Sequence, residues 1–213
     1  MMRITKFEHA NFVVETENKR LIVDPGSFTT SLGEQSDVVA IVVTHEHPDH
    51  WTPEHLRGIL NTNPGAQIFA PAGAASAIGD DFDVTVVGDG DTAEVGPFQL
   101  AFHGSKHAVI HSSIPVVDNV GVLINNTIFY PGDSYTVPPV AVDLLAIPSS
   151  APWLKIGEAM DYLLEVKPKR GFPTHEMVNS AAGKSMANQR FASILEASGG
   201  QYFPLEPGDS LEL

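Results

Sequence analysis

The sequence predicts an α+β protein in which short strands outnumber the helices. Runs rich in β-branched residues recur along the 213-residue chain, and turns containing Gly, Pro or Asn separate them. Two later segments, 156–166 and 184–198, instead carry apolar residues at the spacing of one helix face. No linker or low-complexity tract interrupts the pattern. We therefore expect a single domain over residues 1–213, long enough to form a full-sized core.

The first third of the chain is predicted to be a meander followed by a buried strand. Residues 2–24 contain three strand-like runs, with Asn18-Lys19 as a hairpin turn. The run 38–43 is typical of a fully buried strand, and a helix is expected to begin at Pro53. The expected elements here are the strands 3–7, 11–15, 20–23 and 38–43 and the helix 53–61.

The remaining elements are predicted to complete one sheet and build a second. Residues up to 102 are assigned to the first sheet, with strands 84–87, 92–95 and 98–102 as antiparallel hairpins. Asn125-Asn126 is a favoured turn pair for a later hairpin. Further expected elements are the strand 67–70, the small helix 71–78, the strands 120–124, 127–130, 144–148 and 170–173, and strands at 202–203 and 210–213 that close the second sheet.

The stretch 44–50 holds the strongest chemical signal. It places three histidines and two carboxylates within six residues, directly after the buried strand 38–43. His45 and His47 lie two residues apart, so on extended backbone both rings point the same way. Neutral imidazoles and carboxylates are ligands for Zn, Mn or Fe, and strand ends are where such ligands gather. A zincin helix is excluded, because its two histidines need a four-residue spacing.

Three more candidates for metal ligation follow later strands. Asp133 follows the buried strand 127–130 directly after Pro131-Gly132, and a carboxylate at such a strand end costs free energy unless it is paired or bound to a metal. His175 follows the strand 170–173 in the same way. Between residues 103 and 111, histidines recur every fourth position on a segment that reads as a loop; these are His103, His107 and His111.

Composition excludes several classes of protein. The formal charge of −14, with no run of Lys and Arg, argues against nucleic-acid binding. No apolar run approaches the length of a membrane span, so no membrane contact is expected. The chain has no cysteine, which rules out disulfides and thiolate ligands and is compatible with the cytoplasmic location that we expect.

Residues 44–50, Thr-His-Glu-His-Pro-Asp-His, match the T-H-x-H-x-D-H signature of the metallo-β-lactamase superfamily. Weaker motifs at 24–26, 131–134 and 173–175 occur in the order found in that superfamily, and the whole chain resembles a compact UlaG-like hydrolase. The resemblance implies a four-layer αββα sandwich of metallo-β-lactamase type, with two mixed sheets and the helices outside. It also implies that Asp24 lies near the metal site as a support; a plain turn role for this aspartate is the alternative.

The resemblance further implies a dinuclear site for two divalent metal ions, most simply Zn, with Mn or Fe as alternatives. Asp133 would bridge the two ions. His107 is preferred as the third ligand of the first ion because its distance from the strand 119–125 fits the family best, and His103 and His111 remain alternatives. The implied first-ion ligands are His45, His47 and His107, and the implied second-ion ligands are Asp49, His50 and His175.

The function implied is that of a metal-dependent hydrolase. A metal-bridging hydroxide would cleave an ester, lactone or phosphodiester of a small molecule. Asp49 would orient the hydroxide, and His111 would bind substrate or protonate the leaving group, with a metal-bound water as the alternative acid. Trp153 and Lys155 are expected in a loop at the rim of the site, where they either contact substrate or pack the loop and start the next helix.

Two alternative functions remain open. The first is a metal-dependent oxygenase or oxidoreductase of the same fold, but its redox di-iron relatives carry Glu where this chain has His47. The second is a non-catalytic metal-binding module, which would be expected to have lost a ligand. The oligomeric state is left open, with a homo-oligomer as one option.

Overall fold

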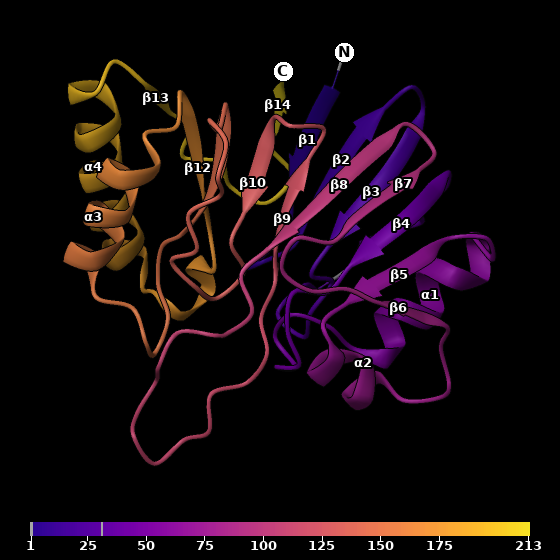
Figure 1. The fold of residues 1–213 in the computed structure, drawn as a ribbon. Coiled ribbons are helices and arrows are strands. Elements are labelled where there is room, and N and C mark those ends of the chain that lie inside the picture. Colours follow the sequence, from indigo (N-terminus) through magenta and orange to yellow (C-terminus); the bar gives the residue numbers. More distant parts are fainter. Residues whose placement is uncertain (1, 31) are drawn as a thin grey trace.

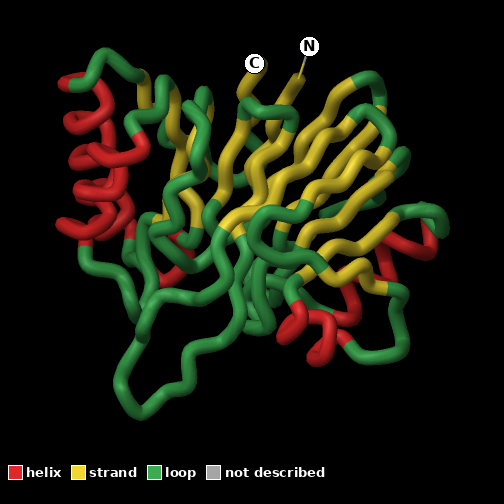
Figure 2. Tube along the Cα trace, viewed as in Figure 1, coloured by secondary structure: helices red, strands yellow, loops and turns green. Residues whose placement is uncertain are grey.

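The computed structural model describes residues 2–30 and 32–213. Two seven-stranded sheets pack face to face, and helices cover the outer face of each sheet (Figure 1, Figure 2). The predicted α+β class and the four-layer αββα arrangement with two mixed sheets are therefore confirmed.

The first sheet begins with the predicted meander and continues as parallel strands. Strands β1 to β3 pair antiparallel, whereas β3 to β6 pair parallel. Tight turns join the meander strands; Glu17 and Asn18, one residue earlier than predicted, take the positive φ values that such a turn requires. In spatial order the strands are β14 (Ser210–Glu212), β1 (Met2–Lys6), β2 (Phe12–Thr16), β3 (Lys19–Val23), β4 (Val38–Val42), β5 (Gln67–Ala70) and β6 (Val84–Val86).

The second sheet has an antiparallel half and a parallel half. Strands β7 to β10 pair antiparallel, and β10 to β13 pair parallel. The turn between β9 and β10 is formed by Asn125 and Asn126, both at φ 50°, as predicted. In spatial order the strands are β13 (Gln201–Tyr202), β12 (Arg170–Thr174), β11 (Leu144–Pro148), β10 (Ile128–Tyr130), β9 (Gly121–Ile124), β8 (Phe98–His103) and β7 (Thr92–Val95).

Three strand assignments made from the sequence were wrong. The hairpin β7–β8 lies in the second sheet, where β8 pairs with β9, and not in the first. Strand β14 pairs with β1 in the first sheet instead of closing the second. Strand β6 runs parallel to β5 instead of forming a hairpin. Each strand was located correctly along the chain, but its apolar pattern carries no information about which edge it joins.

The helices cover the two outer faces. Helices α1 (Pro53–Thr62) and α2 (Ala72–Ile78) pack on the first sheet, and α3 (Ile156–Val166) and α4 (Ala181–Ala197) on the second (Figure 1). Helix α4 starts three residues before the predicted position because the Ser180 hydroxyl caps it, accepting from Gly183 N at 3.1 Å. Among the described residues, no helix is both long and apolar enough to span a membrane.

Both faces of the central strands are buried, because each sheet packs on the other sheet with one face and on helices with the other. In β4, Ala40 and Val42 pack into the core between the sheets, while Ile41 and the following Val43 pack under α1 and α2. This explains why the sequence shows an unbroken apolar run there.

The C-terminal ends of several strands from both sheets lie at the same end of the sandwich. Strands β1, β3 and β4 run in the same direction in the first sheet, as do β8, β10, β11 and β12 in the second. The loops leaving these strands meet at the end opposite the two chain termini (Figure 1). This end collects the candidate ligands.

Candidate metal centre

The first group of ligand-type side chains consists of three histidines from two loops. His45 and His47 follow β4, and His107 follows β8; their candidate ligand atoms lie within 4.8 Å of one another. His45 Nε2 faces His47 Nδ1 at 3.1 Å. An isolated β-bridge between His45 and Asn119, and a hydrogen bond from Val120 N to Thr44 O at 2.9 Å, join the two sheets here.

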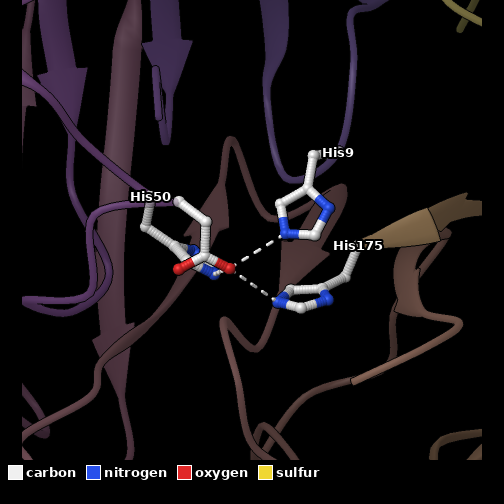
Figure 3. A group of neighbouring side chains, drawn as sticks. His9, His50 and His175 are labelled. Atoms are coloured by element: carbon white, nitrogen blue, oxygen red, sulfur yellow. Dashed lines mark hydrogen bonds and ion pairs between the residues drawn. The ribbon is translucent and has the colours of Figure 1, made fainter. Parts of the chain in front are cut away.

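The second group combines one carboxylate with three histidines: Asp49, His50, His175 and His9. Asp49 Oδ2 lies 3.3 Å from His175 Nε2, 3.7 Å from His50 Nε2 and 3.0 Å from His9 Nε2. Figure 3 shows the three histidine rings converging on the carboxylate from three separate segments of the chain. His9, which is not among the ligands predicted from the sequence, is fully buried.

Asp133 lies between the two groups. One oxygen, Oδ2, lies 3.4 Å from His107 Nε2 and 3.2 Å from His175 Nε2, while Oδ1 lies 3.4 Å from His50 Nε2. The carboxylate therefore contacts the ligand atoms of both groups, as a bridging ligand would. The indole Nε1 of Trp153 donates to Oδ2 at 2.8 Å, which places the ring against the site and not at an open rim.

The chemistry of these groups fits metal ions. His50 Nε2, His107 Nε2, His175 Nε2 and Asp133 Oδ1 are buried polar atoms without a hydrogen-bond partner in the described part of the chain. Such atoms cost free energy unless a ligand satisfies them. The three histidine nitrogens lie 3.2–3.4 Å from an oxygen of the Asp133 carboxylate, which matches the edge of a ligand tetrahedron, about 3.3 Å for metal–ligand bonds near 2.0–2.1 Å.

Asp24 supports the histidine loop and is more than a turn residue. Its Oδ1 accepts from Thr44 N at 2.8 Å, and Oδ2 accepts from Thr44 Oγ1 at 2.7 Å and lies 2.6 Å from His50 Nδ1. The carboxylate thereby fixes the ring orientation of His50, the usual role of a residue that supports a metal-binding histidine. Gly26 is required next to it, because a Cβ there would lie 1.8 Å from Asp49 O.

Burial and charge set the protonation of the site. Burial lowers the pKa of His45 well below its ordinary value, so the imidazole is neutral and able to bind a metal. Burial opposes protonation of His175 too, but Asp133 and Asp49 outweigh it and raise the pKa of His175 to about 10 in the metal-free protein. Although burial acts to raise the pKa of Asp133, His175 and His50 hold it well below the usual range.

The structure places the predicted site residues in two sets. All seven predicted metal ligands come together, and among the three histidines between residues 103 and 111 it is His107 that joins them. His103 packs near Phe129, and His111 is exposed, with Nδ1 2.7 Å from Ser113 Oγ. The role of His111 in proton transfer therefore stays a prediction.

Two further buried residues beneath the site were also missed. Lys6 and Glu176 are almost fully buried, and Lys6 Nζ lies 3.1 Å from Glu176 Oε1. Oε1 also accepts from His9 N at 3.2 Å. A signal for His9 exists in the sequence, because it follows the first strand as His175 follows a late one. Only the parallel direction of β1 and β4 shows that these strand ends meet.

Comparison with known proteins finds a matching family model and a curated relative. A β-lactamase superfamily domain matches residues 3–175. Protein Rv0786c of Mycobacterium tuberculosis is 36% identical over 182 residues, covering 83% of this chain and 85% of that protein.

Solved structures share the fold at low identity. Igni18, a metallo hydrolase from Ignicoccus hospitalis, superposes with a TM-score of 0.75 at 18% identity, covering 100% of this chain and 99% of that one. CmlA, a diiron β-hydroxylase from Streptomyces venezuelae, gives a TM-score of 0.71 at 14% identity, covering 100% of this chain but 54% of the CmlA chain.

Proposed function

The chain belongs to the metallo-β-lactamase superfamily, and from that premise we propose that it is a hydrolase that holds two divalent metal ions and cleaves a small, uncharged ester or lactone. The observation that carries the proposal is the set of buried, unpartnered ligand atoms that converge around Asp133. The fold alone would not carry it, because this fold is shared by proteins with different chemistries.

Seven side chains would hold the metal ions. His45, His47 and His107 would bind the first ion, Asp49, His50 and His175 the second, and Asp133 both. We propose Zn, because imidazole nitrogens dominate the donor set; Mn and Fe are the alternatives to be tested. When bound, such ions supply a nucleophilic water at neutral pH and polarise the oxygen of the scissile bond.

The two carboxylates of the site have different roles. The Asp133 side chain is 4% exposed and is enclosed by His50, His107, His175 and Trp153, so it serves to hold the site together. The Asp49 side chain is 24% exposed and so can reach the substrate side. We assign to Asp49 the orientation of the attacking water through its carboxylate oxygens.

The surroundings favour a neutral substrate over a phosphodiester. Lys106 and Lys155, the lysines on the two loops next to the site, are each paired with a carboxylate, at 2.7 Å to Asp118 and 3.1 Å to Glu158. Phe28 packs edge-on against His9 at 4.7 Å between ring centroids and is 41% exposed. An apolar ring and neutralised cations attract an uncharged acyl group better than a phosphate.

Position 47 favours hydrolysis over oxygen chemistry. Redox di-iron members of the superfamily carry a carboxylate at this position. In this chain the position is His47, whose imidazole lies 3.1 Å from that of His45 in a group made only of histidines. The likeness to CmlA, at 14% identity, shows the shared fold and not a shared reaction.

The test is metal analysis followed by a substrate screen. Protein purified without added metal is analysed for metals, reloaded separately with Zn, Mn or anaerobic Fe(II), and assayed on p-nitrophenyl esters, γ-lactones and bis-p-nitrophenyl phosphate. We expect two equivalents of metal and chelator-sensitive hydrolysis of an ester or lactone. Hydrolysis of the phosphodiester alone would overturn the substrate assignment. Oxygen consumption by the Fe-loaded protein without hydrolysis would overturn the proposed reaction.

A further inference from the structure

His9 is the histidine of the second group whose role the resemblance does not assign. Its Nε2 lies 3.0 Å from Asp49 Oδ2, at a distance that fits both a hydrogen bond and two ligands on one metal ion. The question is whether His9 is a fourth protein ligand of the second ion or a hydrogen-bond donor to Asp49. Either role rests on the two-metal site proposed above.

The second ring nitrogen distinguishes these possibilities. A histidine that binds a metal through one nitrogen almost always donates its other N–H to an acceptor. The other buried ligand histidines follow this rule, with Nδ1 facing an oxygen; the pairs are His45 with Thr44 Oγ1, His50 with Asp24 Oδ2, His107 with Ala108 O and His175 with Ser150 O. His9 Nδ1 is buried and has no partner in the described part of the chain.

This difference fixes the tautomer of His9. If Nε2 bound the ion, Nδ1 would carry a buried N–H without an acceptor, which is costly. If Nε2 carries the hydrogen, it donates to Asp49 Oδ2, and Nδ1 is left as a weaker, unpaired acceptor. We propose that His9 is a positioning residue that donates a hydrogen bond to Asp49 and thereby sets the orientation of this carboxylate toward the second metal ion.

The backbone around His9 is held rigidly for such a role. His9 has φ 59°, an uncommon conformation for a residue other than glycine. Its N–H donates to Glu176 Oε1 at 3.2 Å, and its carbonyl accepts from Lys6 Nζ at 2.8 Å and from His175 N at 3.0 Å. The same buried ion pair thus ties the turn carrying His9 to the turn carrying His175, and the imidazole is presented to Asp49 at a fixed angle.

Two substitutions separate a positioning role from ligation. His9→Gln keeps an N–H donor close to the place of Nε2, whereas His9→Leu removes it at similar volume. His103→Gln is a matched control, because His103 lies on β8 outside both ligand groups. For each protein, metal stoichiometry at saturation and the affinity of the weaker site are measured by competition with a chelator, and the melting temperature is measured without metal.

We expect His9→Leu to bind two equivalents at saturation but with about 10–100-fold weaker affinity at one site. His9→Gln should recover most of that loss, and the metal-free melting temperatures should stay close to that of the wild type. Loss of one full equivalent in both His9 variants would show that His9 is a ligand and overturn the proposal, as would unchanged affinity in His9→Leu. Fewer than two equivalents in the wild type would instead overturn the two-metal site itself.

Discussion

Replacing Glu176 by glutamine tests whether the Lys6–Glu176 ion pair beneath the site is a fully buried charge pair. The side chains of Lys6 and Glu176 are 0% and 2% exposed, and Nζ and Oε1 are 3.1 Å apart. Glutamine keeps the size of the side chain and an acceptor for His9 N, so the substitution removes charge without opening a cavity. Breaking a buried pair by removing one charge costs about 3–5 kcal/mol.

We expect the lower end of this range for Glu176→Gln, about 3 kcal/mol. The ammonium of Lys6 keeps the carbonyl oxygens of Phe7 and His9 as acceptors, and it can also lose its proton. A change of this size lowers the melting temperature by roughly 6–12 °C in a protein of this length. The assay is urea unfolding of the metal-free protein, followed by circular dichroism at constant ionic strength.

The double variant Lys6→Met with Glu176→Gln is the matched control. It removes both charges, and we expect it to be about 1–2 kcal/mol more stable than Glu176→Gln alone. Full recovery is not expected, because Phe7 O loses its hydrogen-bond donor. An unfolding free energy of Glu176→Gln within about 0.5 kcal/mol of the wild type, the range for an ordinary surface substitution, would show that Lys6 and Glu176 are not a buried charge pair.

The pH dependence of the unfolding free energy is a second test of the buried ion pair. Burial lowers the pKa of Lys6 in the folded protein, and Glu176 counteracts this effect. Without the Glu176 carboxylate, the pKa of Lys6 in the folded protein falls further. At pH values between this lowered pKa and the pKa of Lys6 in the unfolded chain, the unfolded chain binds more protons than the folded protein. The stability of Glu176→Gln should therefore rise relative to the wild type as the pH increases from 7 toward 10. A deficit that grows over this window would contradict the assignment.

Three more predictions concern the metal centre. Asp133→Ala should abolish hydrolysis and lower metal stoichiometry while the far-UV circular dichroism stays unchanged; full activity would exclude the bridging role. His107→Ala should lose one metal equivalent, whereas His111→Ala should keep both and only slow turnover, and His103→Ala should change neither; metal analysis of the three variants side by side decides this. Metal loading at pH 7 should release protons, because the pKa of His175 is raised to about 10 without metal and a ligand imidazole must be neutral. Titration calorimetry in buffers of different ionisation enthalpy measures this release, and a release of zero would contradict it.

The sequence by itself determined the local part of the metal centre. His45, His47, Asp49 and His50 lie on one loop, so their spacing and the buried strand before them were enough to indicate their shared role. The locations of the strands and helices were also predictable, because the spacing of apolar residues along the chain indicates which positions are buried. Asp133 and His175 were predictable as chemical types at strand ends, although their contact with each other was not.

The tertiary structure alone decided which segments meet. His9 is 40 residues from Asp49 along the chain, and Lys6 is 170 residues from Glu176. Both contacts exist because β1 runs parallel to β4 and the two sheets place their C-terminal strand ends together. Strands β7, β8 and β14 were assigned to the wrong sheets for the same reason, because their own sequences do not show which segments they pair with. Backbone hydrogen bonds between strands do not depend on the identity of the side chains, so the choice of neighbour depends on packing across the whole core.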